Sequence, residues 1–250
     1  MLDFLTQKKR EYLETFPFFK QFLAGKLDDK TFIADLKQFF QTDDFEQNLV
    51  KNGFTESDIQ RLKLVSEGGF NRFIIVEGSD ASGKTSTANL LRKKVKAAIV
   101  NFPQDFWNRP KGASANEFYS QRIRESSILI LKSLKKGDVI SARYGYSIPA
   151  FAYTYSRGKL KIPPPEGILE PDIIIYVTAS SEEIDKRIKE RAQKGEEIPE
   201  HEADPLLRSL MRQRYDELFT GDPRVIIVDN TGSKVEDVVK ELVRKIKSIQ

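Results

Sequence analysis

Residues 78–85 of the chain read Gly78-Ser79-Asp80-Ala81-Ser82-Gly83-Lys84-Thr85. This stretch fits the phosphate-loop pattern G-x-x-x-x-G-K-[ST] at every fixed position. The apolar, β-branched run before it, residues 72–77, is typical of a buried strand, and Ser86 to Lys96 after it has helical spacing. A strand, a glycine loop and a helix are the context the motif needs, because the loop amides and the helix N-terminus then face a phosphate.

The motif predicts roles for its side chains. Lys84 is expected to reach the β- and γ-phosphates of ATP, and the Thr85 hydroxyl to bind Mg²⁺. Asp80 would repel phosphates if it pointed inward, so we expect it to face a sugar or a cation. The other residues predicted to bind ATP are Gly78, Ser79, Ala81, Ser82, Gly83 and Ser86.

Composition excludes several classes of function. The 41 Lys and Arg against 37 Asp and Glu give a net charge of +4, which suits nucleotide ligands but does not favour binding of nucleic acid. The chain has no cysteine, which excludes disulfides, thiolate catalysis and cysteine zinc sites. The single histidine, His201, excludes clusters of histidine ligands, and we expect it to be an ordinary surface residue.

Hydropathy gives no sign of a membrane partner. Residues 1–10 carry charges where a secretory signal would need an apolar core. No apolar run approaches the length that spans a membrane. We therefore expect a soluble, cytoplasmic protein.

The chain divides into two regions by composition. Residues 1–67 are rich in phenylalanine and predict three or four short helices, and Gly68-Gly69 is the expected hinge into a domain at 70–250. The helical extension is interpreted as a structural or oligomerisation appendage, with docking of a partner as the alternative. A homodimer remains open.

From Phe70 onward the pattern alternates strand and helix. The predicted strands are Arg72–Glu77, Ala97–Phe102, Asp138–Ala142, Asp172–Thr178 and Arg224–Asp229. Three S-x-x-E capping boxes, which begin at Ser114, Ser180 and Ser233, predict helix starts. We therefore expect an α/β phosphate-loop fold with a doubly wound, five-stranded parallel sheet, helices on both faces and a small all-α N-terminal domain.

Several segments between about Phe73 and Ile246 resemble the thymidylate kinase family. The run before the loop, Val76-Glu77-Gly78, resembles the family's Phe-Glu-Gly opening, and Phe102-Pro103 resembles its Phe-Pro segment. Residues 118–122, Phe118-Tyr119-Ser120-Gln121-Arg122, are similar to its base-binding helix. Residues 141–144, Ser141-Ala142-Arg143-Tyr144, fall where the family carries Asp-Arg-Tyr, and Phe151 belongs to the block that follows.

The resemblance implies phosphorylation of dTMP by Mg-ATP, with ATP and dTMP as the small-molecule partners. Phe118 would stack on thymine and Arg122 would bond a base oxygen, because positions i and i+4 share a helix face. Asp80 would accept the sugar 3′-hydroxyl, and Arg143 would hold the acceptor phosphate. The other residues expected at the acceptor are Phe102 and Phe151.

The resemblance also implies a mobile lid, at about residues 190–204. Ala81 leaves no arginine inside the phosphate loop, which resembles the branch whose lid supplies one. Arg187 and Arg191 are therefore the expected catalytic arginines, together with Lys84 and Arg143.

Three departures keep alternatives open. Ala142 replaces the family's aspartate, the segment after Pro103 lacks the usual arginine, and the lid lacks the internal Asp-Arg pair. Another acid, Glu77 or Asp172, could act through water in place of the missing aspartate. Otherwise the chain is a weakened kinase, or an active protein with a deliberate substitution. The alternative functions are a kinase of another deoxynucleotide or deoxynucleoside, or a nucleotide-binding regulatory protein.

Overall fold

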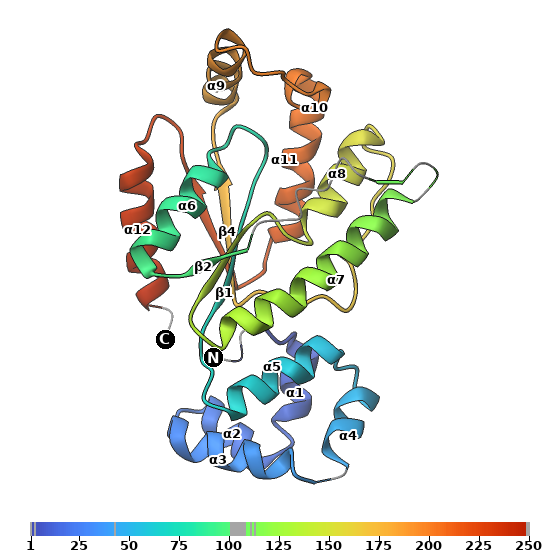
Figure 1. The fold of residues 1–250 in the computed structure, drawn as a ribbon, viewed down its shortest axis with the longest axis vertical. Coiled ribbons are helices and arrows are strands. Elements are labelled where there is room, and N and C mark those ends of the chain that lie inside the picture. Colours follow the sequence, from blue (N-terminus) through green and yellow to red (C-terminus); the bar gives the residue numbers. More distant parts are fainter. Residues whose placement is uncertain are drawn as a thin grey trace.

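The computed structural model describes residues 2, 4–42, 44–100, 109–110, 112 and 114–248. Its N-terminal region is helical, as predicted, and lies against one end of the sheet domain (Figure 1). In the described residues of this region the helices are α1 (Gln7–Leu13), α2 (Pro17–Leu23), α3 (Asp29–Phe39), α4 (Phe45–Lys51) and α5 (Glu56–Ser66). Helix α5 begins with a full capping box, in which Thr55 and Asp58 satisfy each other's backbone amides.

Phenylalanine rings form the core of this helical region. Phe19 and Phe32 are fully buried, and their ring centroids lie 5.2 Å apart in an edge-to-face arrangement. Phe16 contacts Phe18, Phe19 and other rings of the same cluster. The aromatic residues seen in the sequence therefore pack inward against one another.

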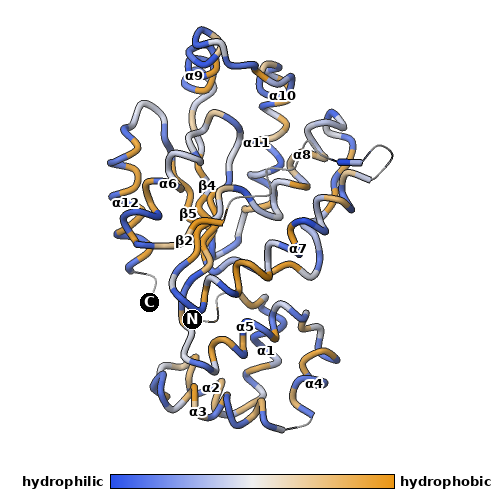
Figure 2. The backbone as a smooth tube through the Cα atoms, viewed as in Figure 1, coloured by the Kyte–Doolittle hydropathy of each residue, from blue (hydrophilic) through white to orange (hydrophobic). Residues whose placement is uncertain are grey.

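The second region contains a five-stranded parallel sheet in the order β2-β3-β1-β4-β5. Its strands are β1 (Phe73–Glu77), β2 (Ala98–Ile99), β3 (Val139–Ala142), β4 (Ile173–Thr178) and β5 (Val225–Asp229). All five predicted strands are present, although β2 is only two residues long. Figure 2 shows the strands as a hydrophobic centre between more polar helices. This is the pattern of a parallel sheet that is covered on both faces.

The helices of this region are α6 (Lys84–Val95), α7 (Ala115–Leu134), α8 (Ser147–Tyr155), α9 (Ser181–Gln193), α10 (Glu200–Ala203), α11 (Pro205–Phe219) and α12 (Val235–Ser248). Because alternate strand residues face opposite sides, Phe73 and Ile75 pack with α7, α8 and α11. Ile74 and Val76 pack with α6 and α12 on the other face (Figure 1). The doubly wound fold is therefore confirmed.

Helix starts follow the predicted capping residues in two of three cases. The hydroxyls of Ser114 and Ser180 accept hydrogen bonds from the amides three residues later, which opens α7 and α9. The prediction at Ser233 was wrong, since α12 begins at Val235 and the Ser233 hydroxyl bonds the carbonyl of Thr231 instead. Among the described residues, no helix is both long and apolar enough to cross a membrane.

The helical region is joined to the sheet domain by buried polar contacts. The Arg61 guanidinium of α5 bonds the Asp172 carboxylate at 2.8 Å, and both side chains are almost fully buried. Asp172 also accepts the amide hydrogen of Phe73, at the amino end of β1. Leu64 of α5 belongs to the main core cluster. The domain boundary at 67–70, docking of a partner by the helices and a homodimer all remain predictions.

Candidate active site

The phosphate loop turns tightly between β1 and α6. Gly78 and Gly83 both have positive φ angles, of 152° and 98°. A Cβ at Gly78 would lie 2.3 Å from the Val177 carbonyl oxygen, and one at Gly83 would lie 2.2 Å from Asn230 Nδ2. Only glycine fits at these two positions, which lets the backbone close around an anion at the start of α6.

Arg187 holds the loop from the side of α9. Its Nη1 donates to the carbonyl oxygens of Ala81 and Ser82, each at 3.0 Å, and its Nη2 donates to that of Asn230 at 2.7 Å. Its Nε is paired with Glu183 at 2.9 Å. Every nitrogen of the guanidinium is therefore engaged by the protein. The predicted role of Arg187 at the transferring phosphate remains a proposal.

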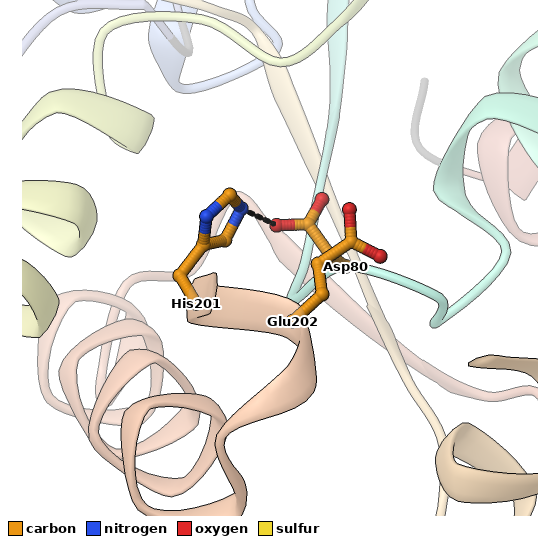
Figure 3. Close-up of side chains that lie close together, drawn as sticks. All are labelled: Asp80, His201 and Glu202. Atoms are coloured by element: carbon orange, nitrogen blue, oxygen red, sulfur yellow. Dashed lines mark hydrogen bonds and ion pairs between the residues drawn. The ribbon is translucent and has the colours of Figure 1, made fainter. Parts of the chain in front are cut away.

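Asp80 is the centre of the charged network. Its Oδ1 accepts hydrogen bonds from Lys84, at 2.9 Å, and from Arg143. Its Oδ2 lies 3.2 Å from Nε2 of His201, as Figure 3 shows. The loop, the end of β3 and α10 are thereby tied to one carboxylate.

The charges of this network stabilise one another. Burial opposes ionisation of Asp80, but Lys84 and Arg143 outweigh it and hold the pKa of Asp80 well below its usual value. Burial, and then the positive charge of Arg143, lower the pKa of Lys84. Burial also opposes the charge of Arg143, yet Asp80 raises the pKa of the guanidinium. The carboxylate is therefore ionised and the Arg143 guanidinium is charged at neutral pH.

A pocket of about 480 Å³ lies between the loop and the lid. It is lined by Asp80, Ala81, Gly83, Lys84, Thr85, Ser86, Arg187, Glu190, Arg191, Lys194 and Glu202. The Thr85 side chain is exposed, and it shares the pocket with the carboxylates of Asp80 and Glu202. The Thr85 hydroxyl is an oxygen donor that fits a magnesium ion arriving with a nucleotide polyphosphate.

Asp80, His201 and Glu202 also bring three donor atoms within 4.8 Å of one another (Figure 3). Lys84 and Arg143 pair with Asp80, and Arg191 pairs with Glu202. Because these cations already neutralise both carboxylates, we interpret the cluster as an ion-pair network and not as a resident metal site.

A second pocket, of about 630 Å³, is rich in aromatic side chains. It is lined by Arg109, Ser114, Ala115, Asn116, Tyr119, Ile148, Phe151, Ala152, Tyr155, Ser156 and Leu160. The rings of Phe151 and Tyr155 stack at 5.9 Å with an interplanar angle of 17°. Planar apolar walls with a few polar groups are typical of a nucleobase site. We call this the aromatic pocket.

Arg143 connects the charged network to the aromatic pocket. Its guanidinium lies 5.0 Å from the centroid of the Phe151 ring, and its backbone takes a positive φ of 70°. In the part of the chain that the structure describes, its buried Nη1 has no hydrogen-bond partner. A buried, charged donor without a partner is the arrangement expected where an anionic group binds.

Phe118 and Arg122 lie together on α7, as their spacing predicted, with the guanidinium 5.4 Å from the ring centroid. Arg122 also pairs with Glu125 at 3.2 Å. The lining of the aromatic pocket includes Tyr119 but neither of these two residues. Their role toward a base remains a proposal, and Phe102 lies outside the described residues.

Arg191 faces the same 480 Å³ pocket from the lid. Its Nε bonds Glu196 at 2.8 Å, and its Nη1 is paired with Glu202. Residues 194–199 connect α9 to α10, so the predicted lid joins these two helices above the loop (Figure 1). Movement of this segment and a catalytic role for Arg191 remain proposals.

The surroundings of Ala142 show which nearby acids could take the role of the family's aspartate. Ala142 ends β3 and pairs with Val76, directly beside the phosphate loop. Glu77 is fully buried and accepts hydrogen bonds from the Tyr144 amide and from the hydroxyls of Ser147 and Tyr215. Its carboxylate is therefore occupied by the protein on both oxygens.

The interpretation of Asp172 as a replacement was wrong. Asp172 precedes β4 and is bound to Arg61 and to the amide of Phe73, at the amino end of the sheet. The phosphate loop lies at the opposite, carboxyl end of β1. Asp172 therefore belongs to the contact with the N-terminal helices.

The prediction that His201 is an ordinary surface residue was also wrong. Its exposed fraction is 7%, and it bonds both Asp80 and the hydroxyl of Tyr155. Sequence reasoning also missed Asn230, whose side-chain amide bonds the Ser82 carbonyl at 2.8 Å. The one signal in the sequence that could have drawn attention to His201 is that it is the only histidine in the chain.

Comparisons with known proteins agree with this geometry. A family model described as thymidylate kinase matches residues 108–242. The probable thymidylate kinase of Methanocaldococcus jannaschii is 29% identical over 195 residues, which cover 72% of this chain and 97% of that protein. The probable thymidylate kinase of Methanococcus maripaludis is 26% identical over 203 residues, which cover 70% and 95%.

A solved structure shows a likeness of fold. The thymidylate kinase of Candida albicans superposes with a TM-score of 0.58 at 23% identity, and covers 71% of this chain and 92% of its own. The family model does not extend into the N-terminal helices. Because the model matches more than half of the residues, this chain belongs to the thymidylate kinase family of phosphotransferases.

Proposed function

We propose that this protein transfers the γ-phosphoryl group of ATP to dTMP and forms ADP and dTDP. A phosphate oxygen of dTMP forms a bond to the γ-phosphorus, and the bond from that phosphorus to the β–γ bridging oxygen breaks. The observation that carries the proposal is Nη1 of Arg143, which has no hydrogen-bond partner among the described residues and lies between the phosphate loop and the aromatic pocket. This is where an acceptor phosphate would meet a donor nucleotide.

Each half of the reaction has its own set of groups. The loop amides and Lys84 would bind the donor phosphates, once Lys84 exchanges its bond with Asp80 for one with phosphate. A magnesium ion that arrives with the nucleotide, and to which Thr85 would contribute its hydroxyl, would neutralise charge on the transferring group. Arg143 would orient the acceptor phosphate, and catalysis would come mainly from position and charge.

Two features support thymine as the base: the family resemblance at Phe118 and Arg122, and the aromatic pocket, which Tyr119 of the same helix lines. Asp80 would accept the 3′-hydroxyl of the acceptor sugar. Among the described residues, three hydrogen bonds reach its two oxygens, and a carboxylate can accept about four. One position on this carboxylate is therefore left for a hydroxyl.

An ADP-release assay with Mg-ATP and a panel of nucleoside monophosphates and deoxynucleosides tests the proposal. We expect turnover with dTMP above all other acceptors. Lys84→Ala should reduce that turnover by about 100-fold or more, since a preorganised cation is lost, while the variant remains folded under the assay conditions. Turnover that survives in Lys84→Ala would remove the phosphate loop from the mechanism.

Ala142→Asp, measured in the same assay, separates the remaining functions. If only this variant is active, the native chain is a kinase scaffold weakened at the end of β3. If both proteins turn over another acceptor faster than dTMP, the substrate assignment is wrong. If neither the native chain nor Ala142→Asp turns over any acceptor, the proposal is overturned and the chain is a nucleotide-binding protein.

A further inference from the structure

We propose that His201 is a positioning residue that latches the lid onto Asp80 and so couples lid closure to binding of the acceptor sugar. This inference rests on the proposed function, since it assigns Asp80 to the acceptor. It begins from the contact of His201 Nε2 with Asp80 Oδ2 at 3.2 Å. The residues are 121 positions apart, and Figure 3 shows the histidine on α10 facing the phosphate loop.

The second nitrogen of the ring fixes its orientation. Nδ1 of His201 lies 2.9 Å from the Tyr155 hydroxyl of α8. Burial, and then the charge of Asp80, raise the pKa of Tyr155, so its hydroxyl keeps its proton at neutral pH. Asp80 is ionised and can only accept. Nε2 therefore donates to Asp80 while Nδ1 bonds the Tyr155 hydroxyl, so both nitrogens of the ring are held.

His201 stands at the boundary between the two pockets. Asp80 and Glu202 line the pocket at the phosphate loop, whereas Phe151 and Tyr155 line the aromatic pocket. The imidazole packs edge-on against Phe151, with centroids 5.4 Å apart at 81°. It therefore contacts the wall of one pocket and the central carboxylate of the other.

This position gives the ring a defined effect. Oδ1 of Asp80 is bonded to Lys84 and Arg143, whereas Oδ2 is bonded to His201 alone among the described residues. The histidine thereby orients Oδ2 of Asp80, the oxygen that a sugar hydroxyl would approach. The same contact holds α10 at the site. Without it, the acceptor would bind to a less ordered Asp80 under an open lid.

The kinetic test compares substitutions at His201 that keep a side-chain nitrogen at the position of Nε2 with substitutions that remove it. His201→Ala and His201→Asn should raise the KM for dTMP about tenfold, the usual effect of one hydrogen bond to a charged group. The KM for ATP should change little. His201→Gln should restore most of the loss, because its terminal amide reaches the position of Nε2. The proposal would be overturned if all three variants raised the KM for dTMP equally, or if the KM for ATP changed as much as the KM for dTMP.

Glu200→Gln is the matched control on the same short helix. Glu200 is 75% exposed, and its partner is Arg157 at 3.7 Å. We expect this variant to keep both KM values. A rise in the KM for dTMP as large as that of His201→Ala would show that any change in α10 has this effect, and would overturn the specific role of the ring.

A measurement without turnover separates this inference from the proposed function. His201 is the only histidine, so ring-labelled protein gives a single set of imidazole signals in NMR. In the free protein Asp80→Asn should shift these signals, and addition of dTMP alone should shift them in the native chain. If the imidazole signals of His201 do not shift in Asp80→Asn, the proposed latch is refuted. If the native chain turns over no acceptor but the Asp80→Asn shift is present, the latch is retained and the proposed function fails.

Discussion

Replacing Arg61 with leucine tests whether the N-terminal helices are part of the folded kinase. The Arg61 and Asp172 side chains are 3% and 7% exposed and lie 2.8 Å apart. The variant removes the guanidinium from this buried contact, while the Phe73 amide still donates to Asp172. Removal of one member of a buried pair costs about 3–5 kcal/mol, because the remaining buried charge loses the opposite charge that faced it.

The assay is urea unfolding followed by circular dichroism, in which Arg61→Leu should lower the free energy of unfolding by that amount. Asp172→Asn and the double variant complete the cycle, and the double variant should lose less than the sum of the single variants. A loss below about 1 kcal/mol, or strict additivity, would refute the reasoning.

An exposed pair between the same two regions is the control for this experiment. Lys135 and Glu67 are 62% and 61% exposed, and their charged atoms are 3.6 Å apart. Lys135→Ala should change the free energy of unfolding by less than about 1 kcal/mol, since water screens the pair. If Lys135→Ala lowers the free energy of unfolding as much as Arg61→Leu does, burial of the pair is not the cause of the loss.

Two further predictions concern the phosphate loop. Burial raises the pKa of Glu77 above 4.5, so the stability linked to this group is present below that value and is lost as pH rises through the folded-state pKa. Thermal unfolding should therefore show Glu77→Gln gaining stability relative to the native chain as pH rises above 4.5, and a constant difference would contradict this. Arg187→Ala should raise the KM for ATP by about tenfold with a smaller change in kcat, because the guanidinium holds loop carbonyls. Steady-state kinetics that show the loss in kcat alone would favour the catalytic role expected from the sequence.

Local patterns predicted the fold well. The strands are short Val- and Ile-rich runs, and β1 and β4 were expected within one residue of their bounds. Ser114 and Ser180 cap helices, as their spacing to a glutamate predicted. Each of these features depends on a few neighbouring residues, so the sequence alone contains the information.

The charged contacts of the site could not be predicted in this way. His201 meets Asp80 across 121 positions, and Arg187 meets the Ala81 carbonyl across 106. Nothing near either residue in sequence indicates its partner, because the contact exists only after α9 and α10 fold over the loop. Asp172 is different, because it begins the predicted strand at 172–178 and its place at the amino end of the sheet was therefore already in the sequence; only its partner Arg61, in a region without a family match, could not be predicted.

The contact between Asp172 and Arg61 has a consequence for how such a chain can change over evolution. In a shorter relative without the helical region, a carboxylate at this position would lie at the uncovered amino end of the sheet, where the Phe73 amide would still hold it and water could reach it. We therefore expect the dependence to run in one direction, from Arg61 to Asp172. A relative that keeps the helices and an arginine at the position of Arg61 should also keep the acid, and loss of the acid beside a retained Arg61 should leave few molecules folded.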